Sequence, residues 1–328
     1  MRRQSAVPPP VTAVMDAGGA WLPVQLGAVE ALLGALSREH GPLLTEDAGA
    51  TLRAGGKRLR PLLVLLCAGP DGGERAVRAG AAIELVHMAT LVHDDVLDEA
   101  PLRRGRPTVA ATSGRARATA TGDLLFAQAF ALLAAAADGR EVALLSDASV
   151  ALARGELAQR RDAYDTTISE QRYLERCELK TARLFECACL MGDAAAAQAA
   201  GEAELRAFGT EVGLAFQLLD DVLDVTGPPE RTGKARGTDL LDGTVTLPLI
   251  LAARRDPSLL DARLGELDAA AAERLCDRIA ATGSLEEVRS RALRMVSSAK
   301  QRLARAAVDS ERRRLLDLVA DGVVERYS

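Results

Sequence analysis

The sequence predicts an all-α fold in which one domain of packed helices spans most of the chain. Hydrophobic residues make up 48% of the 328 residues, but aromatic residues only 3%. The apolar mass is therefore mainly Ala, Leu and Val, which favours helices packed through small side chains. Strand-rich domains rely more on Tyr, Phe, Trp, Ile and Thr. Neither an alternating strand pattern nor a Gly/Ser linker interrupts the chain, so a single helical bundle is the simplest interpretation.

The predicted elements follow one another with recognisable ends. Residues 1–24, with Pro8-Pro9-Pro10 and Gly18-Gly19, are predicted to be a flexible N-terminal tail, and residues 25–328 the helical domain. Pro61 suits the first turn of a helix through 62–66, because its fixed φ matches helical geometry. Further helices are predicted over 74–99, 117–137, 141–162, 169–192, 202–226 and again from Leu247 onward. Between them lie predicted loops at 105–108 and 230–244.

Composition excludes several classes of protein. The net charge of −5 gives no support to a nucleic-acid binder. The five cysteines are odd in number and form no CxxC pair, so neither a disulfide framework nor a zinc site is indicated. The start lacks the apolar core of a secretory signal, and the longest apolar run, 129–137, falls well short of the ~20 residues needed to cross a bilayer. A soluble protein of the reducing cytoplasm is expected.

One pentapeptide occurs twice, as Asp94-Asp95-Val96-Leu97-Asp98 and Asp220-Asp221-Val222-Leu223-Asp224. On a helix the first and last Asp of each copy project from one face, and the intervening Val-Leu is expected to face the core. Both copies fall in the last turns of predicted helices, where the partial negative charge of the helix end disfavours anions. A single copy is equally well explained as a solvated helix end, but two identical copies indicate a function.

Mg²⁺ is the cation that suits such paired aspartates. It binds one or two carboxylates, keeps several waters and completes its shell with substrate phosphates. A calcium loop is disfavoured because its D-x-[DN]-x-[DN]-G spacing is absent. Basic residues next to glycine or close to the motifs suit an anionic, phosphate-bearing substrate, although singly each is more simply a surface cation. No P-loop is present.

At this point the chain resembles the trans-polyprenyl diphosphate synthase family over roughly residues 25–325. The family's motifs are present in order: 55–61 (Gly-Gly-Lys-Arg-Leu-Arg-Pro), 87–98, 103–108, Gly122-Asp123, Gly155-Glu156 with Gln159, 180–182 and 216–221. The resemblance implies an all-α fold around a deep central cavity, usually in a homodimer. It also implies Mg²⁺, with several ions per site, and a reaction that joins isopentenyl diphosphate to an allylic diphosphate.

The resemblance further implies a role for each matching residue. Mg²⁺ would be held by Asp94, Asp95, Asp98, Asp220, Asp221 and Asp224. The allylic diphosphate would be held by Arg103, Lys180, Thr181, Gln217 and Lys234, and isopentenyl diphosphate by Lys57, Arg60, His87 and Arg104. The residues implied to act directly in catalysis are Asp94, Asp98, Arg103, Lys180 and Asp220. Ionisation of the allylic C–O bond, attack by the isopentenyl double bond and loss of a proton would follow, with the departing pyrophosphate as a plausible proton acceptor.

The chain departs from the family's pattern at Thr244, where a lysine is usual. The departure predicts either weaker allylic binding or a substitute cation, for which Arg236 is the candidate. Both Asp motifs are intact, so catalysis is expected to survive. His93 is left open between a core histidine and a ligand contact.

Product length in this family depends on side chains just before the first Asp motif. Ala89 and Thr90 are small, which predicts a product longer than farnesyl, geranylgeranyl or beyond, with Met88 or Ile83 as possible floors of the cavity. One alternative is a catalytic or regulatory subunit of a heteromeric synthase. Another, less favoured, is a class I terpene cyclase, which would show an Asn/Ser/Glu metal triad and an aromatic pocket.

Overall fold

The computed structural model describes residues 9–39, 41–53, 56, 58–103, 105–135, 139–199, 201–227 and 236–325. These residues are helical almost throughout, which confirms the all-α prediction. The helices pack around one continuous apolar core that draws residues from both ends of the chain.

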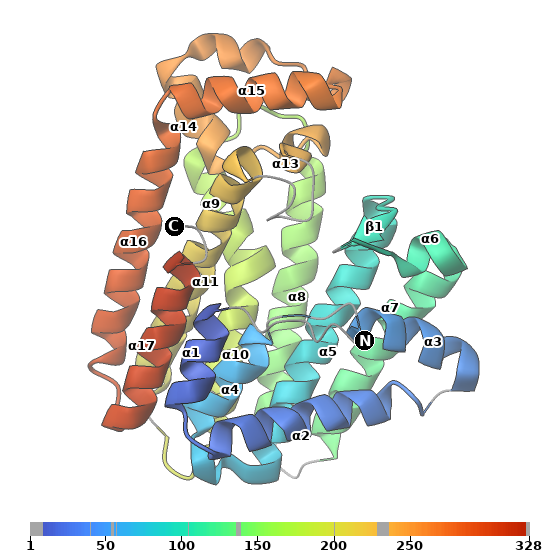
Figure 1. The fold of residues 1–328 in the computed structure, drawn as a ribbon, viewed down its shortest axis with the longest axis vertical. Coiled ribbons are helices and arrows are strands. Elements are labelled where there is room, and N and C mark those ends of the chain that lie inside the picture. The colour runs from blue at the N-terminus through green and yellow to red at the C-terminus, as the bar shows by residue number, and fades with distance from the viewer. Residues whose placement is uncertain are drawn as a thin grey trace.

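The first half of the fold runs from the N-terminal helices to the first Asp motif and beyond (Figure 1). Its elements are α1 (Pro9–Ala17), α2 (Trp21–Leu36), α3 (Gly41–Arg53), α4 (Leu59–Ala68), the 3₁₀ turn η1 (Pro70–Gly72), α5 (Gly73–Leu97), β1 (Leu102–Arg103), β2 (Arg106–Pro107), α6 (Val109–Ser113), α7 (Arg115–Ala134) and α8 (Arg140–Arg161).

The second half carries the second Asp motif and closes the bundle. Its elements are α9 (Glu170–Cys177), η2 (Glu178–Ala182), α10 (Arg183–Ala195), α11 (Glu202–Thr226), α13 (Thr238–Leu241), α14 (Leu247–Arg255), η3 (Pro257–Asp261), η4 (Leu264–Glu266), α15 (Ala269–Ala281), α16 (Ser284–Leu303) and α17 (Ser310–Glu325). Figure 1 shows α15 lying across one end of the bundle and α2 across the other.

Helix α10 is the centre of the molecule. Its residues from 184 to 195 are all buried, and it packs against α4, α5, α8 and α11. A helix that is apolar on every side must be surrounded by others. The two motif-bearing helices, α5 and α11, both contact α10, so the Asp motifs are held by the same core.

The N-terminal segment differs from the predicted flexible tail. Residues 9–17 form α1, which lies against α17, and Val14 and Leu22 are buried. The proline run does not prevent this helix, because prolines are compatible with a first helical turn. The remainder of the predicted tail, residues 1–8, lies outside the described residues.

The predicted loop after the first motif contains a short antiparallel hairpin. Leu102 pairs with Pro107 and Arg103 with Arg106, across a turn that contains Gly105 at φ 72°. Thr108 then begins α6: its hydroxyl donates to the carbonyl of Ala100 and accepts from the amide of Ala111. This hairpin fixes the position of Arg103 beside the motif.

A π-helical turn, η2, joins α9 to α10. Two glycines let neighbouring helices approach it closely. A Cβ on Gly155 of α8 would lie 2.7 Å from the amide nitrogen of Lys180, and one on Gly213 of α11 would lie 2.7 Å from Cα of Ala182. The π turn is therefore held between α8 and α11, and it carries Lys180 and Thr181. Across the described part of the chain, no helix combines the length and the hydrophobicity needed to cross a membrane.

Candidate active site

Two adjoining cavities lie where the motif-bearing helices end. The first, which we call the aspartate cavity, has a volume of about 270 Å³. Its carboxylates are Asp94, Asp98, Asp220, Asp221, Asp239 and Asp242, and its cationic side chains are Arg103, Arg160, Arg176 and Lys180. Thr181 and Gln217 also line it. Of the residues implied to hold metal or the allylic diphosphate, most are thus brought to one place, although they come from four separate elements, α5 with its C-terminal end, β1, η2 and α11.

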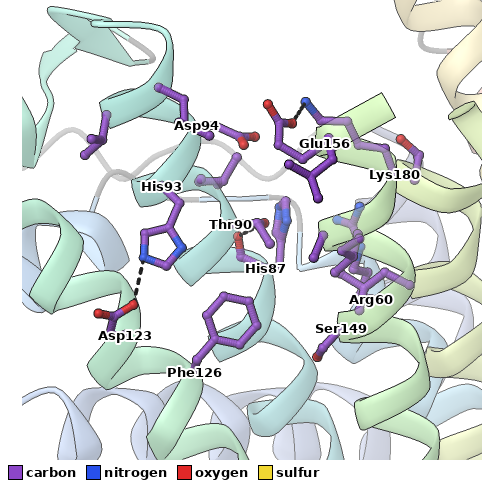
Figure 2. A pocket seen from close by; sticks show the side chains of 18 of the residues that line it. Arg60, His87, Thr90, His93, Asp94, Asp123, Phe126, Ser149, Glu156 and Lys180 are labelled. Atoms are coloured by element: carbon purple, nitrogen blue, oxygen red, sulfur yellow. Dashed lines mark hydrogen bonds and ion pairs between the residues drawn. The ribbon is translucent and has the colours of Figure 1, made fainter. Parts of the chain in front are cut away.

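The second cavity, which we call the apolar cavity, has a volume of about 630 Å³ and lies mainly between α5, α7 and α8. Leu91, Asp94, Lys180, Thr181 and Gln217 line both cavities, so the two are neighbours. In Figure 2, Asp94, Glu156 and Lys180 lie at one end of the apolar cavity, and Phe126 and Ser149 at the other. A ligand with a charged head at Lys180 and an apolar tail beside Phe126 would suit this shape.

The first Asp motif spreads its carboxylates in different directions. Asp94 and Asp98 line the aspartate cavity, as the helical spacing predicts. Asp95 is buried instead, and its Oδ1 accepts a 2.6 Å hydrogen bond from Nε of Arg103. The expectation that Asp95 lines the metal site is therefore not met. Leu97, predicted to face the core, is 47% exposed at the last residue of α5.

Burial has the largest effect on the pKa of Asp94. Burial raises the pKa of this carboxyl group, and the neighbouring carboxylates of Glu156 and Asp98 raise it further, against the opposing charges of Lys180 and Arg103. A carboxylate in such surroundings gains from a cation placed beside it. Asp94 therefore has the character of a metal ligand.

The second Asp motif is held by neutral donors. Asp221 is buried, accepts a 2.5 Å hydrogen bond from the Tyr173 hydroxyl and another of 2.8 Å from the Gln217 amide. The hydroxyl of Thr181 donates in turn to the Gln217 oxygen at 2.7 Å. Burial raises the pKa of Asp221 to about 8, with the nearby carboxylate of Asp239 as the next cause.

The last aspartate of the second motif, Asp224, does not line the aspartate cavity. Its Oδ2 accepts a hydrogen bond from the backbone amide of Asp239, at the start of α13. Helix starts favour such negative groups, since their amides lack partners within the helix. Asp220 does line the cavity, opposite the first motif.

Three ion pairs link Lys180, Glu156, Arg160 and Asp98 beside the two cavities. Lys180 Nζ lies 2.5 Å from Oε2 of Glu156, an ion pair drawn in Figure 2. Arg160 forms a second pair with Glu156, Nε to Oε1 at 2.8 Å, and its Nη2 is paired with Asp98. Arg236, the candidate substitute for the missing lysine, does not line the aspartate cavity: it donates to the carbonyl of Val225 and pairs with Asp277.

The residues implied to hold isopentenyl diphosphate are only partly described. Arg60 and His87 line the apolar cavity, and the Arg60 guanidinium lies 4.8 Å from the centre of the Phe185 ring. Burial lowers the pKa of Arg60 to about 10, which leaves it charged at neutral pH. Lys57, Arg104 and Lys234 lie outside the described residues.

Of the two residues predicted to set product length, only Thr90 lines the apolar cavity. Ala89 is fully buried in the core and lines neither cavity, because one residue along a helix turns the side chain by about 100°. Facing Thr90 from α7 is Phe126, whose ring stacks on His93 at 5.9 Å. Nε2 of His93 lies 3.3 Å from Oδ1 of Asp123, so His93 belongs to the cavity wall. Met88 and Ile83, the suggested floors, are core residues outside its lining.

Mg²⁺ fits the donors present. Asp94, Asp98 and Asp220 offer carboxylate oxygens to one polar space, next to cations able to bind phosphate. Among the described residues, no group of three or more His, Cys, Asp or Glu side chains is placed to hold a metal by itself. Substrate phosphates would therefore have to complete the coordination, as Mg²⁺ permits.

Sequence reasoning missed several of these residues. Tyr173, Arg160 and Asp239 carry no motif of their own, and only their neighbours in space give them a role. Arg160 has one weak signal: it lies four residues after Glu156, so both project from the same face of α8. Phe126 has a similar signal, since it follows Gly122 by four residues, and a Cβ on Gly122 would collide with the His93 ring at 2.2 Å.

Comparisons with known proteins find one family. The polyprenyl synthetase family profile matches residues 42–279. The chain is 45% identical over 235 residues to heptaprenyl diphosphate synthase component 2 of Geobacillus stearothermophilus, covering 69% of this chain and 72% of that protein. It is 40% identical over 219 residues to octaprenyl diphosphate synthase of Haemophilus influenzae, covering 65% of this chain and 66% of that protein.

A solved structure with a similar fold is the polyprenyl synthase of Caulobacter crescentus CB15, complexed with calcium and isoprenyl diphosphate. Its TM-score is 0.89, its identity is 32%, and the match covers 100% of both chains.

Proposed function

This chain belongs to the trans-polyprenyl diphosphate synthase family and is a prenyltransferase, and from that premise we propose that it condenses isopentenyl diphosphate with an allylic diphosphate. The observation that carries the proposal is the pair of adjoining cavities. The aspartate cavity has the charges to hold a diphosphate, and the apolar cavity has the lining to hold its hydrocarbon tail.

The described residues have separate parts in the proposed reaction. Asp94, Asp98 and Asp220 would hold Mg²⁺, which supplies neutralising charge to the departing diphosphate. Arg103 and Lys180 would bind the same diphosphate and stabilise the charge that develops on it as the allylic C–O bond breaks. Arg60 and His87, farther into the apolar cavity, would orient isopentenyl diphosphate for attack on the allylic carbon. Departed pyrophosphate is the proposed proton acceptor, so no side chain is assigned as base.

A product longer than farnesyl is proposed. The relatives named above are synthases of heptaprenyl and octaprenyl diphosphate. Thr90 presents a small side chain to the apolar cavity, which leaves room for a growing tail up to Phe126. The length of the product would then depend on how far the tail extends past Phe126.

The active form is proposed to be a homodimer. Val150 and Leu157 lie seven residues apart on one face of α8 and are 56% and 71% exposed. Leu157 also lines the apolar cavity, so a second copy seated on this face would cover both residues and the mouth beside them. The alternative is a heteromer, which the name "component 2" of the Geobacillus relative favours.

The five cysteines are buried and form no disulfide, which suits a protein of the cytoplasm.

One experiment tests activity, primer and assembly together. The purified protein is incubated with labelled isopentenyl diphosphate, Mg²⁺ and each allylic primer in turn, and product lengths are read by chromatography. Light scattering gives the mass in solution. Elongation by the protein alone supports the homodimer. Failure with every primer, with rescue by an added second subunit, would establish the heteromer instead.

A further inference from the structure

Arg160 is a cation in the aspartate cavity to which neither the family motifs nor the proposed reaction assigns a role. The cavity is lined by more carboxylates than cations, and Thr244 adds only a neutral hydroxyl to its wall. A diphosphate entering this space needs cations that are able to turn toward it. The cationic side chains differ in whether metal binding would release the group that holds them.

Three of the four cations are paired with groups that are not proposed Mg²⁺ ligands. Arg103 is bonded to the buried Asp95 at 2.6 Å, and Lys180 is paired with Glu156 at 2.5 Å. Arg176 is only 4% exposed and donates to the carbonyl of Val245 at 2.5 Å. Mg²⁺ at Asp94, Asp98 and Asp220 would leave these contacts in place, and Arg103 and Lys180 would bind the diphosphate through their other N–H groups.

Arg160 is placed differently. Its side chain is 40% exposed, and the two ends of its guanidinium have different partners. Nε is anchored to Glu156 at 2.8 Å, whereas Nη2 is paired with Asp98, a proposed Mg²⁺ ligand that lines the same cavity. A divalent ion binds a carboxylate more strongly than a guanidinium does, so Mg²⁺ at Asp98 would displace Nη2.

The displaced group would remain at the cavity. Glu156 still holds Nε, and the planar guanidinium has further N–H groups that match phosphate oxygens in pairs. The neighbouring Arg161 provides the contrast. Its side chain is 68% exposed, lies 3.7 Å from Asp162 and does not line the aspartate cavity.

We propose that Arg160 exchanges partners during substrate binding: it neutralises Asp98 before Mg²⁺ arrives and then binds the diphosphate through the freed end of its guanidinium. The proposal rests on the proposed function of the site and adds to it a substrate-binding residue. It predicts effects of opposite sign on two ligands, because Arg160 competes with the metal and assists the diphosphate.

The test compares Arg160→Leu and Arg160→Gln with the matched control Arg161→Leu in the full chain. Calorimetry with inorganic pyrophosphate and Mg²⁺ should show binding weakened by about tenfold to a hundredfold in both Arg160 variants, the loss expected for a charged hydrogen bond. Electron spin resonance with Mn²⁺ alone should show metal binding that is tighter than in the wild type. Arg161→Leu should change neither measurement.

Two outcomes would overturn the proposal. One is pyrophosphate binding in the Arg160 variants equal to that of Arg161→Leu. The other is weaker Mn²⁺ binding in the Arg160 variants, which would mean that Arg160 only maintains the shape of the site. Both readouts are equilibrium binding. A wild-type protein that binds pyrophosphate but elongates no primer, even with an added second subunit, would therefore contradict the proposed function, and the role of Arg160 would still be decided.

Discussion

The two Asp motifs have the same five residues and different surroundings. In the first, the middle aspartate, Asp95, is bonded to a cation, Arg103. In the second, the corresponding Asp221 is bonded to two neutral groups, the Tyr173 hydroxyl and the Gln217 amide. In both, the buried aspartate holds a side chain that lines the aspartate cavity. The pentapeptide places its first aspartate, Asp94 or Asp220, at the cavity in both copies, whereas the elements packed around each copy determine where the second and last aspartates lie.

The largest effect is expected where the two motifs are equivalent. Asp94→Ala and Asp220→Ala should each lower kcat by at least about a thousandfold, because each removes a proposed metal ligand at the developing charge. Initial rates of isopentenyl incorporation over a Mg²⁺ titration measure this. Glu99→Ala is the control, since Glu99 adjoins the first motif with a side chain that is 81% exposed. If only one of the two variants loses activity, the first aspartates of the two motifs are not equivalent.

A smaller effect should separate the motifs. Asp95→Asn removes the charge that holds Arg103, and we expect the KM for the allylic diphosphate to rise about tenfold. Asp221→Asn leaves the neutral donors able to re-pair, and the rise should be smaller. Steady-state kinetics with the allylic substrate varied make the comparison. Equal effects in the two variants would show that the charge of the partner does not matter.

Product length is the measurement that tests the residues one turn before each motif. Thr90 and Phe216 each precede the first aspartate by four residues, and both line the apolar cavity. Thr90→Phe should shorten the product, because it places a ring across the path of the tail. Chromatography of the dephosphorylated products measures the shift.

Ala89→Phe is the control for that experiment. Ala89 is fully buried in the core, so a ring there should overpack it and lower the free energy of unfolding by about 1–3 kcal/mol. The melting temperature should fall accordingly, but the ring should not block the path of the tail. Unchanged products in the Thr90 variant would contradict the assignment of the apolar cavity to the tail.

The smallest effect concerns pH and the second motif alone. The folded protein keeps the proton on Asp221 up to a pH of about 8, whereas the ordinary pKa is 3.8. The unfolded chain therefore releases this proton first, and stability falls as the pH rises between those values. Asp221→Asn removes that loss. Melting temperatures without metal from pH 5 to 9 should show the variant gaining a few degrees on the wild type as the pH rises. A constant difference across this range would refute the assignment.

The sequence was sufficient for the helices and for most of the residues that line the aspartate cavity. Periodicity predicts which residues share a helical face, so the pairing of Asp94 with Asp98 was within reach, and the family resemblance pointed to Lys180 and Thr181. It does not predict what lies across from that face. The burial of Asp95 depends on Arg103 from the hairpin, and the position of Arg160 depends on where α8 crosses α5.

The other differences also have physical causes. Residues 9–17 form a helix because α17, some three hundred residues later, provides its apolar partner. Ala89 faces the core although Thr90 faces the apolar cavity, because adjacent side chains on a helix do not share one direction. Neither the distant partner nor the exact rotation is encoded in local composition.

The π turn at 178–182 constrains the number of residues in this part of the chain rather than the chemistry of the site. A π turn holds one residue more than an α turn of the same rise, so it stores a single-residue insertion inside a buried helix. Deleting one residue there would let an ordinary α-helix form. The two flanking helices would keep their facing, but the turn that carries Lys180 and Thr181 would be lost, and these two side chains would change direction. Along this helix, chain length is itself under constraint, and single-residue deletions should be tolerated far less than in the loops.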